Sequence, residues 1–222
     1  MRKGLFSTYT GWIILANIIA FVAFLVLISA YGEESAINLF ALQPKAVLTG
    51  FAFWTLITSM FLHANFTHLF VNMISLMFIG SFVERLVGNK RFLIFYFVAG
   101  LASGLLFVLL AGFFGDNPLG MRLFGSPLTY AVGASGAIFG LGGLLAVLTP
   151  KLRVLLFFII PMPMWFAMIG MLAILWLLSF SAGLPIGNVA HLGGLLIGVA
   201  YGFYLKHKYP RKTAMISRYF SR

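Results

Sequence analysis

Apolar residues follow one another in long runs along most of the chain, and short polar stretches separate these runs. Uncharged apolar runs of about 20 residues are typical of helices that cross a membrane. The runs cover approximately residues 11–30, 66–83, 92–114, 135–149, 154–180 and 189–205. They predict an all-α polytopic membrane protein with six transmembrane helices, and we expect residues 1–222 to form a single membrane domain without a separate soluble domain.

The stretches between the runs also differ in character. Residues 31–59 are too polar to cross the membrane and too apolar to lie entirely in water. We therefore expect a loop in the membrane interface, with Trp54 as its anchor at the level of the lipid headgroups. A polar, glycine-rich segment covers residues 115–130 and leads into the fourth run, and we expect residues 125–132 to be non-helical. Pro161 and Pro163 should bend or interrupt the first turns of the fifth helix. The first run is too long for a cleaved signal peptide, which favours a retained signal-anchor helix.

The fourth run is the shortest, and it begins at Ser135. About 14 residues separate Ser135 from Pro150, whereas roughly 20 are needed to cross the hydrocarbon. A helix that ends at one membrane face would therefore begin well inside the bilayer. Irregular backbone at that depth must be buried in protein or line a water-filled cavity. The sequence thus predicts that Ser135 and the glycine-flanked turn before it face such a cavity.

Composition supports the membrane assignment. The chain is 62% hydrophobic, only 9% charged and has a net charge of +11. The positive charge lies between or after the apolar runs, which argues for membrane orientation rather than nucleic-acid binding. With six spans and a cytoplasmic N-terminus, all 15 Lys and Arg residues except Lys45 and Arg122 fall on the cytoplasmic side. Both termini are then cytoplasmic, and the cavity at Ser135 opens to the external face. The absence of cysteine excludes disulfides and thiolate chemistry.

Four polar side chains stand out within the predicted helices: His68, Asn72, Ser135 and His191. Each alone has an ordinary structural explanation, but polar groups inside a membrane are costly and are functional candidates. Glycines follow His191 on its helical face, and further glycines line the fourth helix beside Ser135; the two sets are Gly194, Gly198 and Gly202, and Gly136, Gly140 and Gly143. Glycine-lined helices approach closely, which would bring a serine hydroxyl within reach of an imidazole that acts as a general base.

His68 and Asn72 are four residues apart and share one helical face. Two side-chain donors aimed at one point suit an oxyanion stabiliser, with the Ser135 backbone N–H as a third donor. Metal binding by His63, His68 and His191 is a competing interpretation, although no intramembrane carboxylate or thiolate completes a ligand set. No carboxylate is available to orient His191, so the predicted catalytic unit is a Ser–His dyad rather than a triad.

Three motifs in this order resemble those of the rhomboid intramembrane serine proteases: His63-Ala-Asn-Phe-Thr-His68-Leu-Phe-Val-Asn72, Gly133-Ala-Ser135-Gly136, and Ala190-His191-Leu-Gly-Gly194 with Gly198. The likeness covers roughly residues 54–204. It implies a six-helix fold with Ser135 as the nucleophile and His191 as the general base and acid. It also implies oxyanion contacts from His68, Asn72 and the Ser135 backbone N–H.

The resemblance assigns supporting roles as well. Rhomboids often carry a tyrosine one turn after the serine, packed against the catalytic histidine; here the residue is Phe139, which keeps the stacking without the hydroxyl. His63 resembles a structural histidine of the family. The fifth helix resembles the family's lateral gate, and residues 181–188 resemble its cap loop. A substrate helix would then enter between the second and fifth helices.

Two other functional classes stay open at this point. A catalytically inactive rhomboid-like scaffold would bind membrane clients, but such relatives usually lack the serine or the histidine. A small transporter would show inverted repeats and charged translocation residues, neither of which is visible. We expect transmembrane protein substrates, contact with membrane lipid, no cofactor, no metal, no nucleic-acid partner and a monomer. The expected location is the plasma membrane of a prokaryote.

Overall fold

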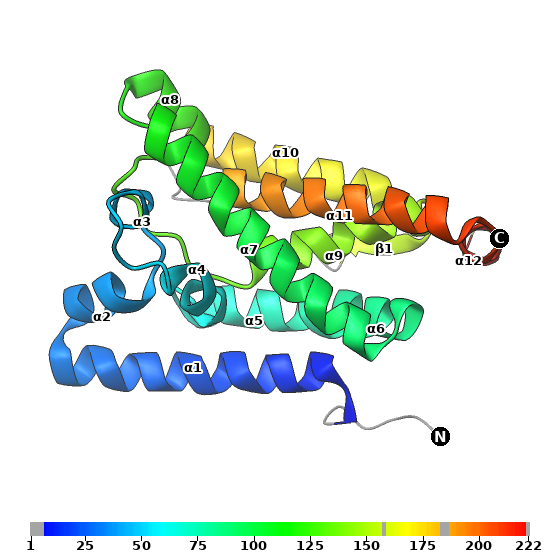
Figure 1. Cartoon of the computed structure of the whole chain (residues 1–222), viewed down its shortest axis with the longest axis horizontal. Helices are drawn as coiled ribbons and strands as arrows, with labels where there is room; N and C mark the ends of the chain where they lie inside the picture. The colour runs from blue at the N-terminus through cyan, green and yellow to red at the C-terminus, as the bar shows by residue number, and fades with distance from the viewer. Residues whose placement is uncertain (1–6, 157–158, 183–186, 221–222) are drawn as a thin grey trace.

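The computed structural model describes residues 7–156, 159–182 and 187–220. Helices dominate it, and the longest of them run roughly side by side along the long axis of the molecule (Figure 1). The long helices are α1 (Tyr9–Tyr31), α7 (Asn89–Phe114), α10 (Met164–Ala182) and α11 (Asn188–Lys208), together with a continuous helical stretch made of α5 (Phe66–Ser75), the π-helical segment η3 (Leu76–Gly80) and α6 (Ser81–Val87).

Among the described residues, five helices are long and apolar enough to cross a membrane, namely Tyr9–Tyr31, Phe66–Val87, Asn89–Phe114, Met164–Ser181 and Asn188–Lys208. A shorter apolar helix, α9 (Ser135–Leu148), has 14 residues. At about 1.5 Å per residue it is roughly 21 Å long, shorter than the hydrocarbon core of a bilayer. The protein is therefore an integral membrane protein in which Ser135 begins the short helix, as the sequence predicts.

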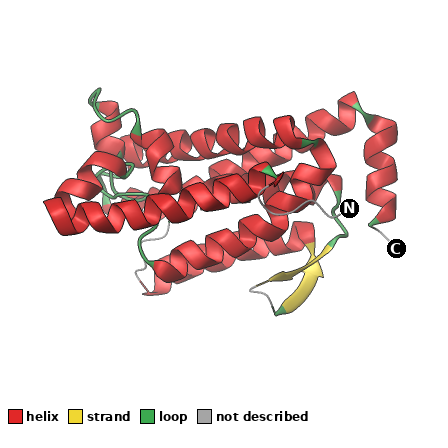
Figure 2. Ribbon diagram, turned by 90° about the horizontal axis from the view of Figure 1, so that it is seen from below, coloured by secondary structure: helices red, strands yellow, loops and turns green. Residues whose placement is uncertain are grey.

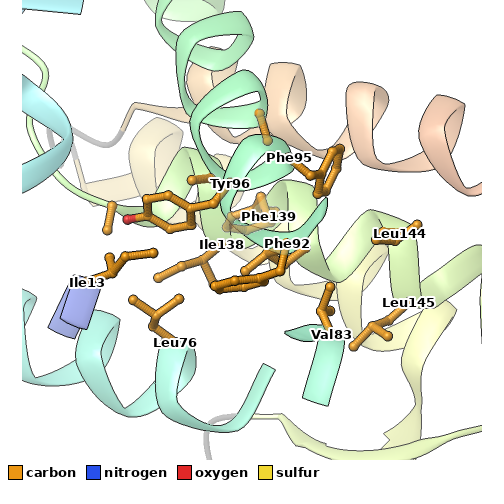
Figure 3. Close-up of a cluster of buried hydrophobic side chains, with 14 of the residues drawn as sticks. Ile13, Leu76, Val83, Phe92, Phe95, Tyr96, Ile138, Phe139, Leu144 and Leu145 are labelled. Atoms are coloured by element: carbon orange, nitrogen blue, oxygen red, sulfur yellow. The ribbon is translucent and has the colours of Figure 1, made fainter. Parts of the chain in front are cut away.

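Helix α9 forms the centre of the molecule. Its main neighbours are α11 and α7, with α10 also packed against it. All of its residues except Ser135 and Ala146 are buried. Figure 3 shows apolar side chains of α9, including Ile138, Leu144 and Leu145, packed against residues of α7 such as Phe92. Because neighbouring helices cover it, α9 keeps its position without having to span the bilayer alone.

Short helices fill the two long connections at one end of the molecule. The connection after α1 contains α2 (Glu33–Phe40), α3 (Pro44–Leu48), α4 (Thr55–Thr58) and the 3₁₀ turn η2 (Ser59–Phe61), and the connection after α7 contains α8 (Pro118–Phe124). Residues 125–132, which we expect to be non-helical, indeed contain no helix, whereas the earlier part of the polar segment forms α8, which has Asn117 as its N-cap and Pro118 at its first position. Leu42 and Ala131 join the two connections through a pair of backbone hydrogen bonds of 3.0 and 2.8 Å.

Trp54 is about half exposed (51%), and its indole N–H donates to the Leu39 carbonyl oxygen at 2.7 Å. An apolar ring that is accessible and a polar end that is bonded suit the interface position predicted for it. This hydrogen bond therefore joins α2 to the start of α4.

The N-terminus of α1 is capped by a buried carboxylate from α6. Glu84 is 3% exposed and accepts hydrogen bonds from the backbone N–H groups of Tyr9 (2.8 Å) and Thr10 (2.9 Å). The Thr10 hydroxyl donates a third bond at 2.6 Å. The first N–H groups of a helix lack intrahelical partners and carry partial positive charge, so a carboxylate there is stabilising. Glu84 thus fixes α1 to the rest of the bundle.

The predicted start of the fifth helix is wrong. Residues assigned to its first turns instead form an antiparallel pair of strands, β1 (Arg153–Leu156) and β2 (Ile160–Pro163), which projects from the helices in Figure 2. Helix α10 begins only at Met164. Pro161 and Pro163 lack the N–H that a helix interior needs, and an apolar run alone does not distinguish a strand from a helix.

The other predicted boundaries lie within a few residues of the observed ones. Residues 183–186 of the predicted cap loop lie outside the described residues. The basic tail after α11 forms a further helix, α12 (Pro210–Tyr219), which turns away from the axis of α11 (Figure 2). Its amphipathic pattern places Thr213 against the bundle while Met215 and Tyr219 are exposed.

Candidate active site

Ser135 and His191 are 56 positions apart in the sequence and meet at the centre of the molecule. The Ser135 Oγ lies 2.8 Å from the His191 Nε2, a normal hydrogen-bond distance. Ser135 is the first residue of α9 and His191 lies in the first turn of α11. The two side chains therefore meet where both helices begin.

Glycines allow the two helices to come this close. A Cβ atom on Gly194 would lie 1.9 Å from the Gly136 carbonyl oxygen, and one on Gly198 would lie 2.1 Å from the Gly140 carbonyl oxygen. Real side chains do not tolerate such distances, so α9 and α11 pack backbone against backbone. The short Ser135 side chain reaches the imidazole only because of this approach.

Phe139 lies one turn after Ser135 and stacks on His191. The ring centroids are 4.6 Å apart and the planes differ by 19°. Figure 3 shows Phe139 projecting from α9 within the buried cluster. The stacked ring restricts rotation of the imidazole and presents a π-face to it.

The turn before Ser135 depends on Gly133. Its φ is 123°, in a region that L-residues with side chains rarely adopt, and its N–H donates to the Ser59 carbonyl oxygen at 2.8 Å. A Cβ atom there would lie 2.9 Å from both Cε1 and Nε2 of His68 and 3.6 Å from the Ser135 Oγ. The bare α-carbon therefore leaves room for the His68 ring edge beside Ser135.

The hydrogen bonds of His68 indicate its tautomer. The Nδ1 atom accepts from the Ala64 backbone N–H at 3.4 Å, and the His68 backbone N–H donates to the side chain of Asn65, the N-cap of α5, at 2.8 Å. A neutral imidazole whose Nδ1 accepts carries its proton on Nε2. This N–H lies on the ring edge next to Gly133, so His68 can act as a donor toward the Ser135 site.

Asn72 lies one turn further along α5 and lines the same cavity as Ser135. It is 5% exposed, and its Nδ2 donates to the His68 carbonyl oxygen at 2.8 Å. A carboxamide nitrogen has two N–H donors, so one stays available for another acceptor.

His63 is buried next to His68, with 1% of its surface exposed. The two rings meet edge to face with centroids 5.0 Å apart. Burial is the main cause that lowers the pKa of His63 to about 4, and the neighbouring His68 lowers it as well. His63 is thus a neutral packing partner of the His68 ring at ordinary pH.

Ser103, on α7, was not singled out by the sequence. Its hydroxyl donates to the carbonyl oxygen of Ala190, the residue before His191, at 2.6 Å, and a Cβ atom on Gly136 would lie 2.0 Å from the same hydroxyl. The side chain therefore sits where α7, α9 and α11 meet. A single serine in a span usually bonds within its own helix, so no sequence signal marked this one.

Ser135 and His191 lie in the wall of a cavity of about 1,570 Å³, which His68, Asn72 and Gly133 also line. The cavity extends to the gap between α5 and α10, since Val71 of α5 and Phe78 of η3 line it together with Met168, Met171 and Leu175 of α10. Space for a large apolar ligand therefore connects the serine with the gap between these two helices.

Within the described residues there is no group of three or more His, Cys, Asp or Glu side chains arranged to hold a metal ion. Of the three histidines weighed for metal binding, His191 bonds Ser135, and His63 packs edge to face on the His68 ring. The arrangement at Ser135 suits nucleophilic chemistry instead.

Comparison with known proteins agrees with the three motifs. Residues 50–208 match the Rhomboid domain. The chain is 33% identical over 199 residues to Rhomboid-like protease 3 of Toxoplasma gondii, covering 87% of this chain and 67% of that protein. It is 32% identical over 173 residues to the mitochondrial RHOMBOID-like protein 6 of Arabidopsis thaliana, covering 74% of this chain and 48% of that protein. It is 29% identical over 165 residues to Rhomboid protease GluP of Bacillus subtilis, covering 72% of this chain and 27% of that protein.

The chain thus spans about two thirds of the Toxoplasma protein and about half or less of the other two. The matched region contains the short helix α9, the start of α11 and the whole of α5. With a domain match over most of its length and the three motifs gathered around one cavity, this integral membrane protein belongs to the rhomboid family.

Proposed function

We propose that the protein is an intramembrane serine endopeptidase that cleaves transmembrane segments of other membrane proteins with a Ser135–His191 dyad. The observation that carries the proposal is the 2.8 Å separation between the Ser135 Oγ and the His191 Nε2 in the wall of a large cavity. Relatives that are named proteases support the same reaction class.

In the proposed reaction the His191 Nε2 accepts the Ser135 hydroxyl proton while the Oγ attacks the scissile carbonyl carbon. The carbonyl π electrons move to oxygen, which becomes an oxyanion. His191, now an imidazolium, returns the proton to the leaving amine as the C–N bond breaks. A water molecule then attacks the acyl-enzyme with His191 as its general base, which releases the acid product and restores Ser135.

The oxyanion needs donors close to Ser135. The proposed donors are the His68 Nε2–H, the free N–H of the Asn72 carboxamide and the backbone N–H of Ser135, which begins α9. N–H groups in the first turn of a helix have no intrahelical acceptor, and the helix dipole favours negative charge there. Removal of one such donor typically costs about 100- to 1,000-fold in rate.

The imidazolium has no carboxylate beside it. Among the described residues, the His191 Nδ1 is buried and has no hydrogen-bond partner. The parallel Phe139 ring is the group that faces the imidazole, and a cation over an aromatic face is stabilised. Phe139 therefore takes over part of the task that an aspartate performs in a triad.

The proposed substrate is a transmembrane helix that enters between α5 and α10. The apolar side chains lining the cavity at this gap, such as Val71 and Met171, support this route. The polar part of the cavity, at His68 and Asn72, is where an unwound segment of the substrate would expose its carbonyl groups. We further propose that α9 joins the five long helices as a sixth membrane-inserted helix and that both termini are cytoplasmic.

Active-site labelling in detergent tests the dyad. Purified wild type, Ser135→Ala and His191→Asn would be treated with a fluorophosphonate probe, and the modified residue located by mass spectrometry. Ser126→Ala is the matched control because it removes another hydroxyl that lines the same cavity. We expect label on Ser135 in the wild type and the control, and none in the other two variants. Labelling or substrate cleavage that persists in Ser135→Ala contradicts the proposal.

The topology can be tested separately because the chain has no cysteine. Lys45→Cys, in α3, and Lys212→Cys, in α12, place single thiols at opposite ends of the molecule. A membrane-impermeant maleimide applied to intact cells should label the first and spare the second. The reverse pattern contradicts the proposed orientation.

A further inference from the structure

Two cations converge on one tyrosine at the end of the molecule that carries α12. The Arg91 Cζ lies 5.4 Å from the centre of the Tyr209 ring, and its Nη2 donates to the Tyr209 hydroxyl at 3.3 Å. The Lys208 Nζ lies 5.8 Å from the same ring centre. It also lies 5.3 Å from the ring centre of Tyr204 and donates to the hydroxyl of that residue at 2.8 Å. We call Arg91, Lys208, Tyr204 and Tyr209 the Tyr209 cluster.

The side-chain carboxylates of the chain are engaged or placed elsewhere. The sequence contains four Asp and Glu residues in total. Glu84 uses its oxygens on the N-terminus of α1. Glu33 and Glu34 lie in the first turn of α2, and Asp116 lies between the C-terminal end of α7 and the start of α8. Both α2 and α8 are at the opposite end of the molecule from α12 in Figure 1. The two cations therefore share a ring while no side-chain carboxylate is placed to neutralise them.

Both cations have donors to spare. A guanidinium carries five N–H donors and an ammonium three, and the tyrosine hydroxyls take one from each. Both side chains are exposed. Phosphate oxygens are strong acceptors for these groups, and an arginine can bind two of them at once. The cluster thus has the charge and the donors that a phosphate group requires.

Its depth matches that of lipid phosphates. Arg91 lies in the first turn of the span Asn89–Phe114, and Lys208 is the last residue of the span Asn188–Lys208. Span ends lie at the level of the lipid headgroups, where tyrosine and basic residues are enriched. The exposed Met215 and Tyr219 of α12 add apolar contact surface at the same end.

We propose that the Tyr209 cluster is a binding site for the headgroup phosphate of an anionic phospholipid. The phosphate lies between the Arg91 guanidinium and the Lys208 ammonium. An anionic headgroup is preferred over a zwitterionic one because the choline of phosphatidylcholine would bring another positive charge to a site that already holds two. The site is independent of the Ser135 chemistry and anchors α12 and the start of α7 to one leaflet.

The test uses the purified full chain in phosphatidylcholine bilayers with a trace of spin-labelled phosphatidylglycerol or spin-labelled phosphatidylcholine. The fraction of immobilised label reports lipid bound to protein. We expect the wild type to prefer phosphatidylglycerol. Arg91→Gln or Lys208→Gln should each reduce this preference about fivefold, and the double variant about 30-fold, as expected for roughly 1 kcal/mol per basic residue near the surface. Arg91→Lys should keep most of it.

The matched control is the double variant Lys206→Gln/Arg211→Gln, which removes the same charge from α11 and α12 but leaves the Tyr209 cluster intact. Circular dichroism of every variant reports folding. Equal retention of the two lipids by the wild type overturns the proposal, and so does an equal loss in the control and the Arg91/Lys208 variants. Isothermal titration calorimetry with inorganic phosphate distinguishes a lipid headgroup from a free anion as the ligand. If the protein binds inorganic phosphate but shows no preference for phosphatidylglycerol, the ligand is a soluble anion and the lipid site is contradicted.

Discussion

Gly198 and Gly140 lie in direct backbone contact, since a Cβ atom on Gly198 would stand 2.1 Å from the Gly140 carbonyl oxygen and 2.9 Å from its carbonyl carbon. This contact is two turns away from the Ser135–His191 pair on the same helix interface. The spacing between α9 and α11 at Ser135 and His191 is therefore set partly by glycines outside this pair.

Gly198→Ala should push the two helices apart. Overpacking of a tight interface typically costs about 1–3 kcal/mol, so we expect a lower unfolding temperature and slower probe labelling of Ser135. Thermal unfolding followed by circular dichroism in detergent measures the first effect. Gly170→Ala in α10 is the control, because a Cβ atom there meets nothing within 4 Å. Equal behaviour of the two variants would mean that the contact between Gly198 and Gly140 does not control helix spacing.

Glu84→Gln should weaken the attachment of α1. The carboxylate accepts three bonds from Tyr9 and Thr10, and hydrogen bonds to charged groups contribute about 1.5–3 kcal/mol each. We expect a fall in unfolding free energy of at least that size, and a double-mutant cycle with Thr10→Val should show coupling. Glu33→Gln, at an exposed acidic residue of α2, is the control and should leave stability nearly unchanged. Additive effects of Glu84→Gln and Thr10→Val would contradict the network.

Ser103, which bonds the Ala190 carbonyl oxygen, could not be predicted from the sequence, whereas Ser135 and His191 could. Ser135 is identifiable because an apolar run that is too short begins with it, and His191 because an imidazole in a glycine-lined span needs a reason. Ser103 sits in a long, ordinary apolar run, and its importance arises only from the crossing of α7 with α9 and α11. Side-chain contacts between distant segments of this kind leave no local pattern.

Ser103→Ala should therefore affect the dyad more than overall stability. Loss of one buried hydrogen bond typically costs about 0.5–1.5 kcal/mol, but the carbonyl that loses its donor belongs to the residue next to His191. We expect slower labelling of Ser135 by the probe at a nearly unchanged unfolding temperature. Ser75→Ala removes a hydroxyl from the α5 wall of the same cavity and serves as the comparison. A parallel loss of stability and labelling would reduce Ser103 to a packing residue.

The strand pair β1–β2 is a feature that the apolar pattern predicted wrongly. Residues 154–160 are a continuous apolar run, and such a run favours a strand or a helix equally when no polar residue sets a period. Pro161 and Pro163 indicate a disturbance in the helix, but not a pair of strands before it. The π-helical segment Leu76–Gly80 is also invisible in the sequence, because it contains no polar residue that would mark a shift in the helical phase.

Acid should destabilise the fold through His63. Its pKa is about 4 in the folded protein against an ordinary value of 6.5, so the unfolded chain binds the proton more readily. Stability is then unaffected above about pH 6.5 and falls as the pH drops from there toward 4, by about 3 kcal/mol in all. Unfolding midpoints measured across this range should fall less steeply in His63→Phe.

The control for this effect is His207→Asn, which changes an exposed histidine near the end of α11. It should retain the acid dependence of the wild type. The two pKa values of His63, 6.5 unfolded and about 4 folded, set the limits of the pH range. If stability falls with pH equally steeply in His63→Phe and wild type over this range, a different group is responsible for the acid sensitivity.

The central position of α9 bears on how the molecule is completed during synthesis. A 14-residue helix is a poor candidate for independent insertion, and its principal neighbour, α11, is synthesised after it. Until α11 arrives, the hydroxyl of Ser135 has no imidazole and the glycine face of α9 has no cover. A nascent chain therefore carries Ser135 without its contact to His191, and the proposed hydrolytic activity requires that α11 has docked.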